Sequence, residues 1–130
     1  MSSSEVARFV KEGLFSVAAD GRSLSRCDAV IICVQTPLRK SKEPDISTIV
    51  AVCGELSKRL RRGQLVILES TTYPGTTDEV VRPALETSGL KAGKDFFLAF
   101  SPERVDPGNA KWNIPNTPKV VGGIERRSTR

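Results

Sequence analysis

The chain has 130 residues, of which 38% are hydrophobic and 27% charged, a balance that indicates one globular domain and argues against a disordered chain. Its net charge of +5 is spread along the chain, and we interpret its basic runs as solvated surface. An aromatic content of 5% argues against nucleic-acid binding by base stacking. Histidine is absent and the three cysteines form no CxxC pair, so we expect neither a metal site nor a disulfide framework. The apolar runs are too short to span a membrane and no signal-peptide pattern opens the sequence, so we expect a cytoplasmic protein.

The first third of the chain predicts a helix followed by two strands. Ser2–Glu5 has the S-x-x-E form of a capping box, apolar residues follow at helical spacing, and Gly13 ends the helix. Phe15–Ala19 is a candidate for a short strand. Ala29–Val34 is a continuous, largely β-branched run, which predicts a strand buried on both faces of a parallel sheet and places Cys33 in the core.

The middle of the chain predicts a second helix and a second buried strand. Thr36–Pro44 is polar and holds two prolines, so we expect a loop, after which Asp45 caps the helix. Leu65–Leu68 is the next buried strand. The helix between them is indicated by apolar residues at helical spacing, which are Ile46, Ile49, Val50, Cys53, Leu56 and Leu60.

The last part of the chain predicts one more helix and two more strands. Thr76 and Glu79 have the spacing of a capping box for a helix that ends at Gly89. Phe96–Phe100 predicts a third buried strand, and Lys119–Val121 a last short one. Strands that alternate with helices over short connections are typical of βαβ units, and we therefore predict an α/β fold with a parallel sheet.

Three polar loops follow the predicted strands, and ligands of open parallel sheets bind beyond the carboxyl ends of the strands. The loops are Val34–Pro37, Glu69–Gly75 and Ser101–Gly108. They offer hydroxyls, carboxylates and a guanidinium, which together predict a site for a polar ligand but do not name a reaction. Structural alternatives stay open: Thr36 and Pro37 end a strand, Thr76 caps a helix, and Glu103 and Arg104 are solvated or paired.

Four segments in these regions resemble the NAD-binding domain of the nucleotide-sugar 6-dehydrogenases, in order and in spacing. They are DAVIICVQTPL (28–38), LESTTYPGTT (68–77), LAFSPERVDPG (98–108) and KVVGG (119–123). The SPERV-x-PG form is more similar to the branch that oxidises UDP-N-acetylglucosamine than to the UDP-glucose branch. The resemblance implies the later part of a Rossmann-type doubly wound parallel sheet.

The resemblance also implies an activity: the C6 alcohol of a UDP-sugar is oxidised through an aldehyde to a carboxylate, with two NAD molecules used in turn, for polysaccharide biosynthesis. Full-length relatives of this kind are expected to be homo-oligomers. By the same resemblance Val34, Thr36 and Pro37 line the NAD site. Ser70 and Thr71 match the Ser-Thr loop near the nicotinamide, where the Thr71 hydroxyl assists catalysis by holding a water.

Two further residues carry the implied chemistry on the substrate side. Glu103 matches a glutamate that works near the reacting carbon as an acid/base or water-positioning group. Arg104, beside it, is a candidate substrate contact, as is Glu103 itself.

The sequence also departs from the family pattern. It holds no G-x-G-x-x-G loop for the pyrophosphate, and neither Cys27, Cys33 nor Cys53 matches the motif of the family's catalytic thiol. We therefore expect a partial NAD-binding domain over residues 1–123 without its first two strands, a charged tail over 124–130, and no activity of the chain alone. The alternative is a non-catalytic α/β binding or interaction module derived from this fold.

The missing strands predict a defect in the sheet. In the strand order 3-2-1-4-5-6, Phe15–Ala19 would be the third strand and Ala29–Val34 the fourth, with strands one and two absent between them. Either Phe15–Ala19 pairs with Ala29–Val34, or the latter keeps an open edge of the kind that promotes self-association.

Overall fold

The computed structural model describes residues 2–40, 42–106 and 108–129, which form a small mixed α/β unit. Its helices are α1 (Ser3–Lys11), a 3-10 helix (Gly21–Arg26), α2 (Ser47–Ser57), a π-helical turn (Thr77–Val81) that leads into α3 (Arg82–Glu86), and α4 (Arg126–Thr129). Its strands are β1 (Ala29–Ile32), β2 (Leu65–Leu68), β3 (Phe97–Phe100) and β4 (Gly122–Gly123).

The four strands form one sheet in the order β1-β2-β3-β4. The first three are parallel, with Ala29 opposite Leu65 and Leu65 opposite Phe97, which confirms the predicted βαβ connections. The last strand differs from the prediction: Gly122–Gly123, and not Lys119–Val121, pairs with β3, and it runs antiparallel. This direction returns the segment before β4 to the carboxyl edge of the parallel strands.

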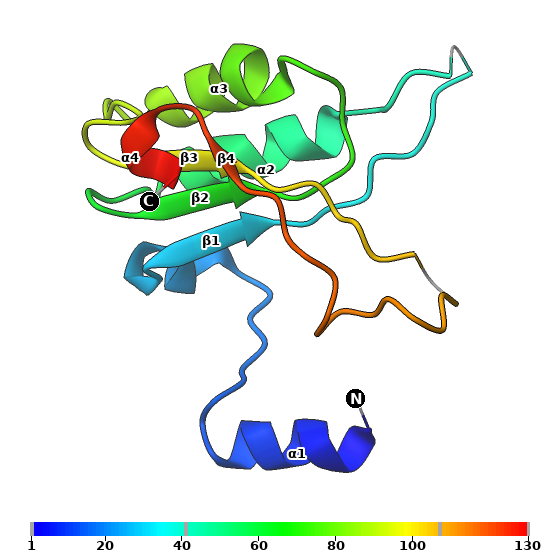
Figure 1. The fold of residues 1–130 in the computed structure, drawn as a ribbon. Coiled ribbons are helices and arrows are strands. Elements are labelled where there is room, and N and C mark those ends of the chain that lie inside the picture. Colours follow the sequence, from blue (N-terminus) through cyan, green and yellow to red (C-terminus); the bar gives the residue numbers. More distant parts are fainter. Residues whose placement is uncertain (1, 41, 107, 130) are drawn as a thin grey trace.

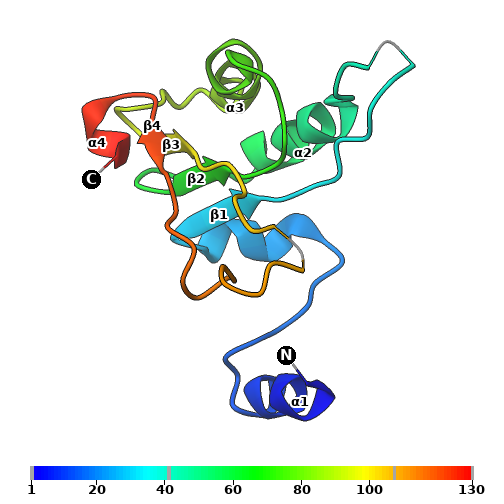
Figure 2. The same ribbon diagram turned by 45° about the vertical axis from the view of Figure 1, so that its right-hand side comes forward.

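Helices α2 and α3 cover one face of the sheet (Figures 1 and 2). The core between them is built from alternate strand residues and from one side of each helix, and it comprises Ile32, Val66, Leu68, Leu98, Ile49, Cys53, Leu56, Val81, Leu85 and Phe96. Cys53, on the apolar face of the predicted helix, is thus a core residue. Cys33 is exposed, contrary to prediction, because β1 ends at Ile32 and the next residue already belongs to the loop.

The edge strand β1 is open on the side away from β2. Ile31 is 56% exposed, so this strand is not buried on both faces as its apolar sequence predicts. Phe15–Ala19 forms no strand; its residues are exposed and lie on the extended connection between α1 and the 3-10 helix (Figure 1). Of the two outcomes expected for β1, the described residues show the open edge.

Helix α1 is held by its own caps and not by the core. Ser2 and Glu5 form the predicted capping box, and Gly13 adopts the positive φ of 72° that ends the helix. None of the helix residues is buried, and Figure 2 shows α1 well apart from the sheet. The predicted caps therefore specify a helix whose apolar face the described residues leave uncovered.

Two other predicted caps differ from the structure. Asp45 accepts a hydrogen bond from the Ser47 N–H at 3.0 Å, although the helix boundary falls at Ile46. Thr76 and Glu79 form no capping box: the Thr76 hydroxyl donates to the Tyr73 carbonyl at 2.8 Å instead. This local hydrogen bond to the backbone of the preceding turn forms in place of the helix cap.

The segment predicted as a charged tail, 124–130, packs against the fold in its described part. Within the described part, 124–129, Ile124 packs against the core and Ser128 is buried. The Leu98 N–H of β3 donates to the Ser128 hydroxyl at 3.2 Å, and the Ile124 N–H donates to the Leu98 carbonyl at 3.0 Å. The sequence does not predict this packing, because the buried residue of α4 is a serine and α4 has no apolar stripe.

Candidate functional site

The carboxyl ends of β1, β2 and β3 lie at one edge of the sheet, and the three loops singled out in the sequence leave from it (Figure 1). Because β4 is antiparallel, the segment that contains Lys119 arrives at the same edge. Residues from four distant parts of the sequence therefore meet where ligands of such sheets bind.

A buried serine ties the first two loops together. Ser70 is 4% exposed; its hydroxyl accepts a hydrogen bond from the Val34 N–H at 2.8 Å and donates to the Val34 carbonyl at 2.9 Å. Both backbone groups of Val34 are satisfied in this way, although Val34 lies beyond the end of β1. The structure thus brings together two of the residues predicted for the cofactor site, and the Ser70 hydroxyl is used inside the protein.

Thr71 is the neighbour whose hydroxyl is available. It is exposed and, within the described residues, its hydroxyl has no hydrogen-bond partner, whereas the hydroxyls of Ser70, Thr72 and Thr76 are all engaged. On the first loop Thr36 is half-buried and Pro37 is exposed. No hydrogen bond or ion pair in the described residues joins these three side chains to Glu103, although all of them lie on loops from the same sheet edge.

Glu103 is held at both carboxylate oxygens. Its Oε1 accepts the backbone N–H groups of Arg104 at 2.6 Å and Val105 at 2.7 Å, and its Oε2 accepts from Lys119 Nζ at 3.1 Å. The Val105 N–H, then Lys119, then the Arg104 N–H lower the pKa of Glu103 below its ordinary value. Glu103 is therefore a carboxylate held in a fixed orientation, with its ionised form favoured.

Lys119 also donates to Glu69 Oε1 at 2.7 Å, which joins the loop after β2 to the loop after β3. Glu69 and Glu103, in this order, raise the pKa of Lys119. Sequence reasoning missed both Lys119 and Glu69. The available signal was their position in the motifs at 68–77 and 119–123, but the antiparallel direction of β4 cannot be seen in those motifs.

Arg104 is not part of the ionic group formed by Glu69, Glu103 and Lys119. Among the described residues its guanidinium forms no ion pair, so neither Glu103 nor Asp106 neutralises it. It lines a hollow of about 310 Å³ together with Asp106, Asn109, Trp112, Thr117 and Pro118. An unpaired guanidinium beside a carboxylate-bearing loop suits an anionic or hydroxyl-rich ligand.

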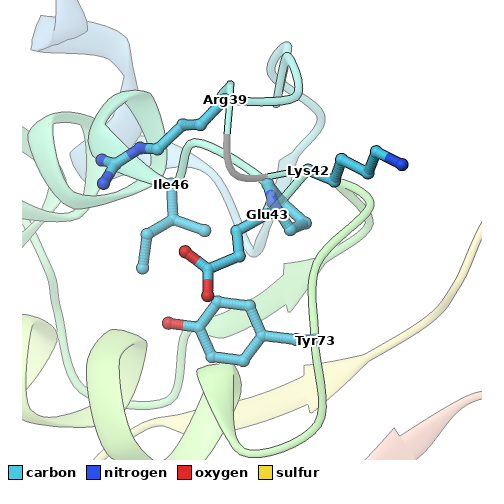
Figure 3. A pocket seen from close by; sticks show the side chains of 6 residues that line it. Arg39, Lys42, Glu43, Ile46 and Tyr73 are labelled. Atoms are coloured by element: carbon cyan, nitrogen blue, oxygen red, sulfur yellow. The ribbon is translucent and has the colours of Figure 1, made fainter.

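Tyr73 stands on the wall of two further pockets. One, of about 590 Å³, opens between the first and second loops and is lined by Arg39, Lys42, Glu43, Pro44, Ile46 and Tyr73 (Figure 3). The other, of about 480 Å³, lies between the second and third loops and is lined by Thr72–Gly75, Thr77, Phe100 and Pro102. The sequence shows Tyr73 only as an isolated aromatic residue, and its position between two pockets comes from the loop geometry.

The described residues contain no group of three His, Cys, Asp or Glu side chains that could hold a metal ion. None of the helices in the described ranges has the length and apolar character needed to cross a bilayer.

Comparison with known proteins identifies the family. Residues 3–130 match the NAD binding domain of the UDP-glucose/GDP-mannose dehydrogenase family. The chain belongs to this family. NAD is thus the cofactor of the family domain to which the chain belongs, and the Rossmann-type expectation for the fold is confirmed.

Relatives of the chain are named dehydrogenases of nucleotide sugars. UDP-N-acetyl-D-glucosamine 6-dehydrogenase of Pseudomonas aeruginosa is 40% identical over 103 residues, which are 78% of this chain and 24% of that protein. UDP-N-acetyl-D-mannosamine dehydrogenase of Pyrococcus horikoshii is 35% identical over 128 residues, which are 95% of this chain and 30% of that protein.

Solved structures of the family superpose closely on this fold. NDP-N-acetyl-D-galactosaminuronic acid dehydrogenase of Methanosarcina mazei Go1 gives a TM-score of 0.86 at 42% identity, over 95% of this chain and 27% of that one. GDP-mannose dehydrogenase of Pseudomonas aeruginosa gives 0.84 at 30% identity, over 96% and 30%. The chain therefore spans less than a third of the length of these relatives.

Proposed function

We propose that this chain supplies the later part of the NAD-binding domain of a nucleotide-sugar 6-dehydrogenase that oxidises a UDP-N-acetylhexosamine, of the UDP-N-acetylglucosamine type. The observation that carries the proposal is the family match over residues 3–130. The finer substrate assignment is supported by the SPERV-x-PG segment at 101–108 and by relatives named for N-acetylated hexosamines.

NAD, when bound, would supply the acceptor for the hydride from the sugar C6. The residues of this chain would position the nicotinamide. We propose that Val34, Thr36 and Pro37 form one wall of the nicotinamide region, with Val34 fixed by Ser70. The exposed Thr71 hydroxyl, without a partner in the described residues, fits a contact to a water or to the cofactor amide.

The pyrophosphate has no matching cradle in this sequence, since no G-x-G-x-x-G occurs in it. The residues present therefore fit the nicotinamide end of NAD and not its phosphates.

On the substrate side, we assign Glu103 the role of a water-positioning carboxylate. Because its pKa is lowered, Glu103 is ionised and has no proton to donate. Its fixed negative charge can instead orient a water and stabilise developing positive charge. Arg104 would contact the substrate, whose diphosphate and hydroxyl groups suit its unpaired guanidinium. The product would be a nucleotide-linked uronic acid, a donor for polysaccharide synthesis, formed in the cytosol where NAD and UDP-sugars are available.

A chimera tests the function. The 103 matching residues of this chain would replace their counterpart in the Pseudomonas aeruginosa UDP-N-acetyl-D-glucosamine 6-dehydrogenase, with the glycine loop and the thiol supplied by the host protein. We expect NADH formation with UDP-N-acetylglucosamine, and none from the 130-residue chain alone, where the nucleophile and the phosphate loop are missing. A folded but inactive chimera would overturn the proposal and favour the non-catalytic module.

A further inference from the structure

Three charged side chains from distant segments form one connected group at the carboxyl edge of the sheet. Lys119 Nζ lies 2.7 Å from Glu69 Oε1 and 3.1 Å from Glu103 Oε2. Glu69 follows β2, Glu103 follows β3, and Lys119 precedes the antiparallel β4. One ammonium thus bridges the two loops that carry Thr71 and Glu103.

The two carboxylates are not equivalent. The Glu69 side chain is 19% exposed and makes the shorter bond, whereas the Glu103 side chain is 48% exposed. Lys119 is consequently anchored on Glu69 and presents its remaining donors to Glu103. The other oxygen of Glu103 is already fixed by the two backbone N–H groups that follow it.

We propose that Lys119 is a positioning residue: anchored on Glu69, it fixes the orientation of the Glu103 carboxylate at the substrate side of the site. This inference rests on the proposed function, because it assigns Glu103 a place near the reacting carbon. The charged groups that face Glu103 are Lys119 directly and Glu69 through Lys119. Without Lys119, the backbone N–H groups of Arg104 and Val105 would still hold Glu103 Oε1, but Glu103 Oε2 would be free to turn toward solvent.

The competing interpretation is an ordinary surface ion pair. Such pairs contribute little to stability and have no part in a reaction. Stability alone therefore cannot separate the two interpretations, and the readouts must report on Glu103 itself. Lys91 provides a matched control, because it forms a similar exposed pair with Glu86 at 3.0 Å before β3, at the other end of that strand.

The first experiment uses the 130-residue chain and does not depend on its function. The Glu103 carboxyl is titrated by carbon-13 NMR in the unmodified chain and in Lys119→Met, Lys119→Arg and Lys91→Met. We expect the pKa of Glu103 to rise toward its ordinary value in Lys119→Met only, and Lys119→Arg to keep it low. An unchanged Glu103 titration in a folded Lys119→Met chain would overturn the proposal.

The second experiment places the same variants in the chimera. We expect Lys119→Met to lower kcat by about 10- to 100-fold through misplacement of Glu103, with the KM for NAD unchanged. The acid limb of the pH–rate profile should move to higher pH. Lys119→Arg should restore most of kcat, and Lys91→Met should leave it unchanged. A Lys119→Met chimera with the original kcat would overturn the positioning role.

If the unmodified chimera is inactive, the proposed function fails, and the NMR titration alone decides whether Lys119 holds Glu103. The two failures are thus distinguishable.

Discussion

Replacing Gly123 by alanine tests whether α4 belongs to the fold. A Cβ at this position would lie 2.5 Å from the Ser128 carbonyl carbon and 2.6 Å from the Thr129 nitrogen, which are backbone atoms that cannot rotate away. Gly122 is the matched control, since a Cβ there meets nothing within 4 Å. Both substitutions reduce the entropy of the unfolded chain equally, so their difference reports the clash.

The size of the effect follows from two routes. If α4 stays in place, overpacking costs about 1–3 kcal/mol. If α4 moves away, water replaces the Ser128 hydroxyl at the Leu98 N–H, and the lost hydrogen bond costs about 0.5–1.5 kcal/mol. With a shift of about 4 °C per kcal/mol for a chain of this size, Gly123→Ala should melt about 2–12 °C below Gly122→Ala.

Circular dichroism melts and urea titrations of the two variants measure this difference. Hydrogen exchange at the Leu98 amide supplies a local readout, because loss of α4 exposes this one N–H while the β2–β3 pairing remains. Equal melting temperatures together with unchanged Leu98 exchange would refute the packing of α4 against β4.

Three further predictions follow from single side chains. Ser70→Ala should destabilise the fold by about 1–3 kcal/mol, because the backbone that its hydroxyl satisfies loses both partners, whereas Thr71→Ala should change stability by less than about 0.5 kcal/mol; equal thermal shifts would contradict this. Asp45 has its pKa lowered to about 2, chiefly by a backbone N–H and next by a guanidinium. Its stabilisation is present above the ordinary aspartate pKa and is lost as the pH falls to about 2, so Asp45→Asn should flatten the acid limb of the stability curve, and an unchanged limb would argue against the pair. Burial raises the pKa of Cys53 to about 11, so iodoacetamide should modify the exposed Cys33 first, and mass spectrometry showing equal rates in the native chain would disprove the burial.

The parts of the fold that could be predicted are those that local sequence specifies. Leu65–Leu68 is an apolar run of strand length, and it is β2 with the predicted bounds. Ser2 and Glu5 lie three residues apart and satisfy each other without help from the rest of the chain. The alternation of strands and helices predicted a parallel sheet, and it therefore placed the three loops at one sheet edge, since parallel strands end together.

The parts that could not be predicted depend on contacts between distant residues. Phe15–Ala19 has strand composition, but a strand also needs a ladder partner, and none forms there in the described residues. Thr76 has cap spacing, but the Tyr73 carbonyl takes its hydroxyl. In the site, Lys119 and Glu103 are separated by 16 positions and Lys119 and Glu69 by 50, so no local pattern joins them.

The same long-range contacts explain why this edge of the sheet is suited to chemistry. Loops beyond strand ends are free to move unless something other than the ladder holds them. Here Ser70 fixes the backbone after β1, and Lys119 joins the loops after β2 and β3. Each device leaves one neighbouring group exposed, Thr71 in the first case and Glu103 in the second. A site in which buried or anchored groups hold the exposed ones is preorganised, and this division supports the contact roles that we propose for Thr71 and Glu103 and the positioning roles that we propose for Ser70 and Lys119.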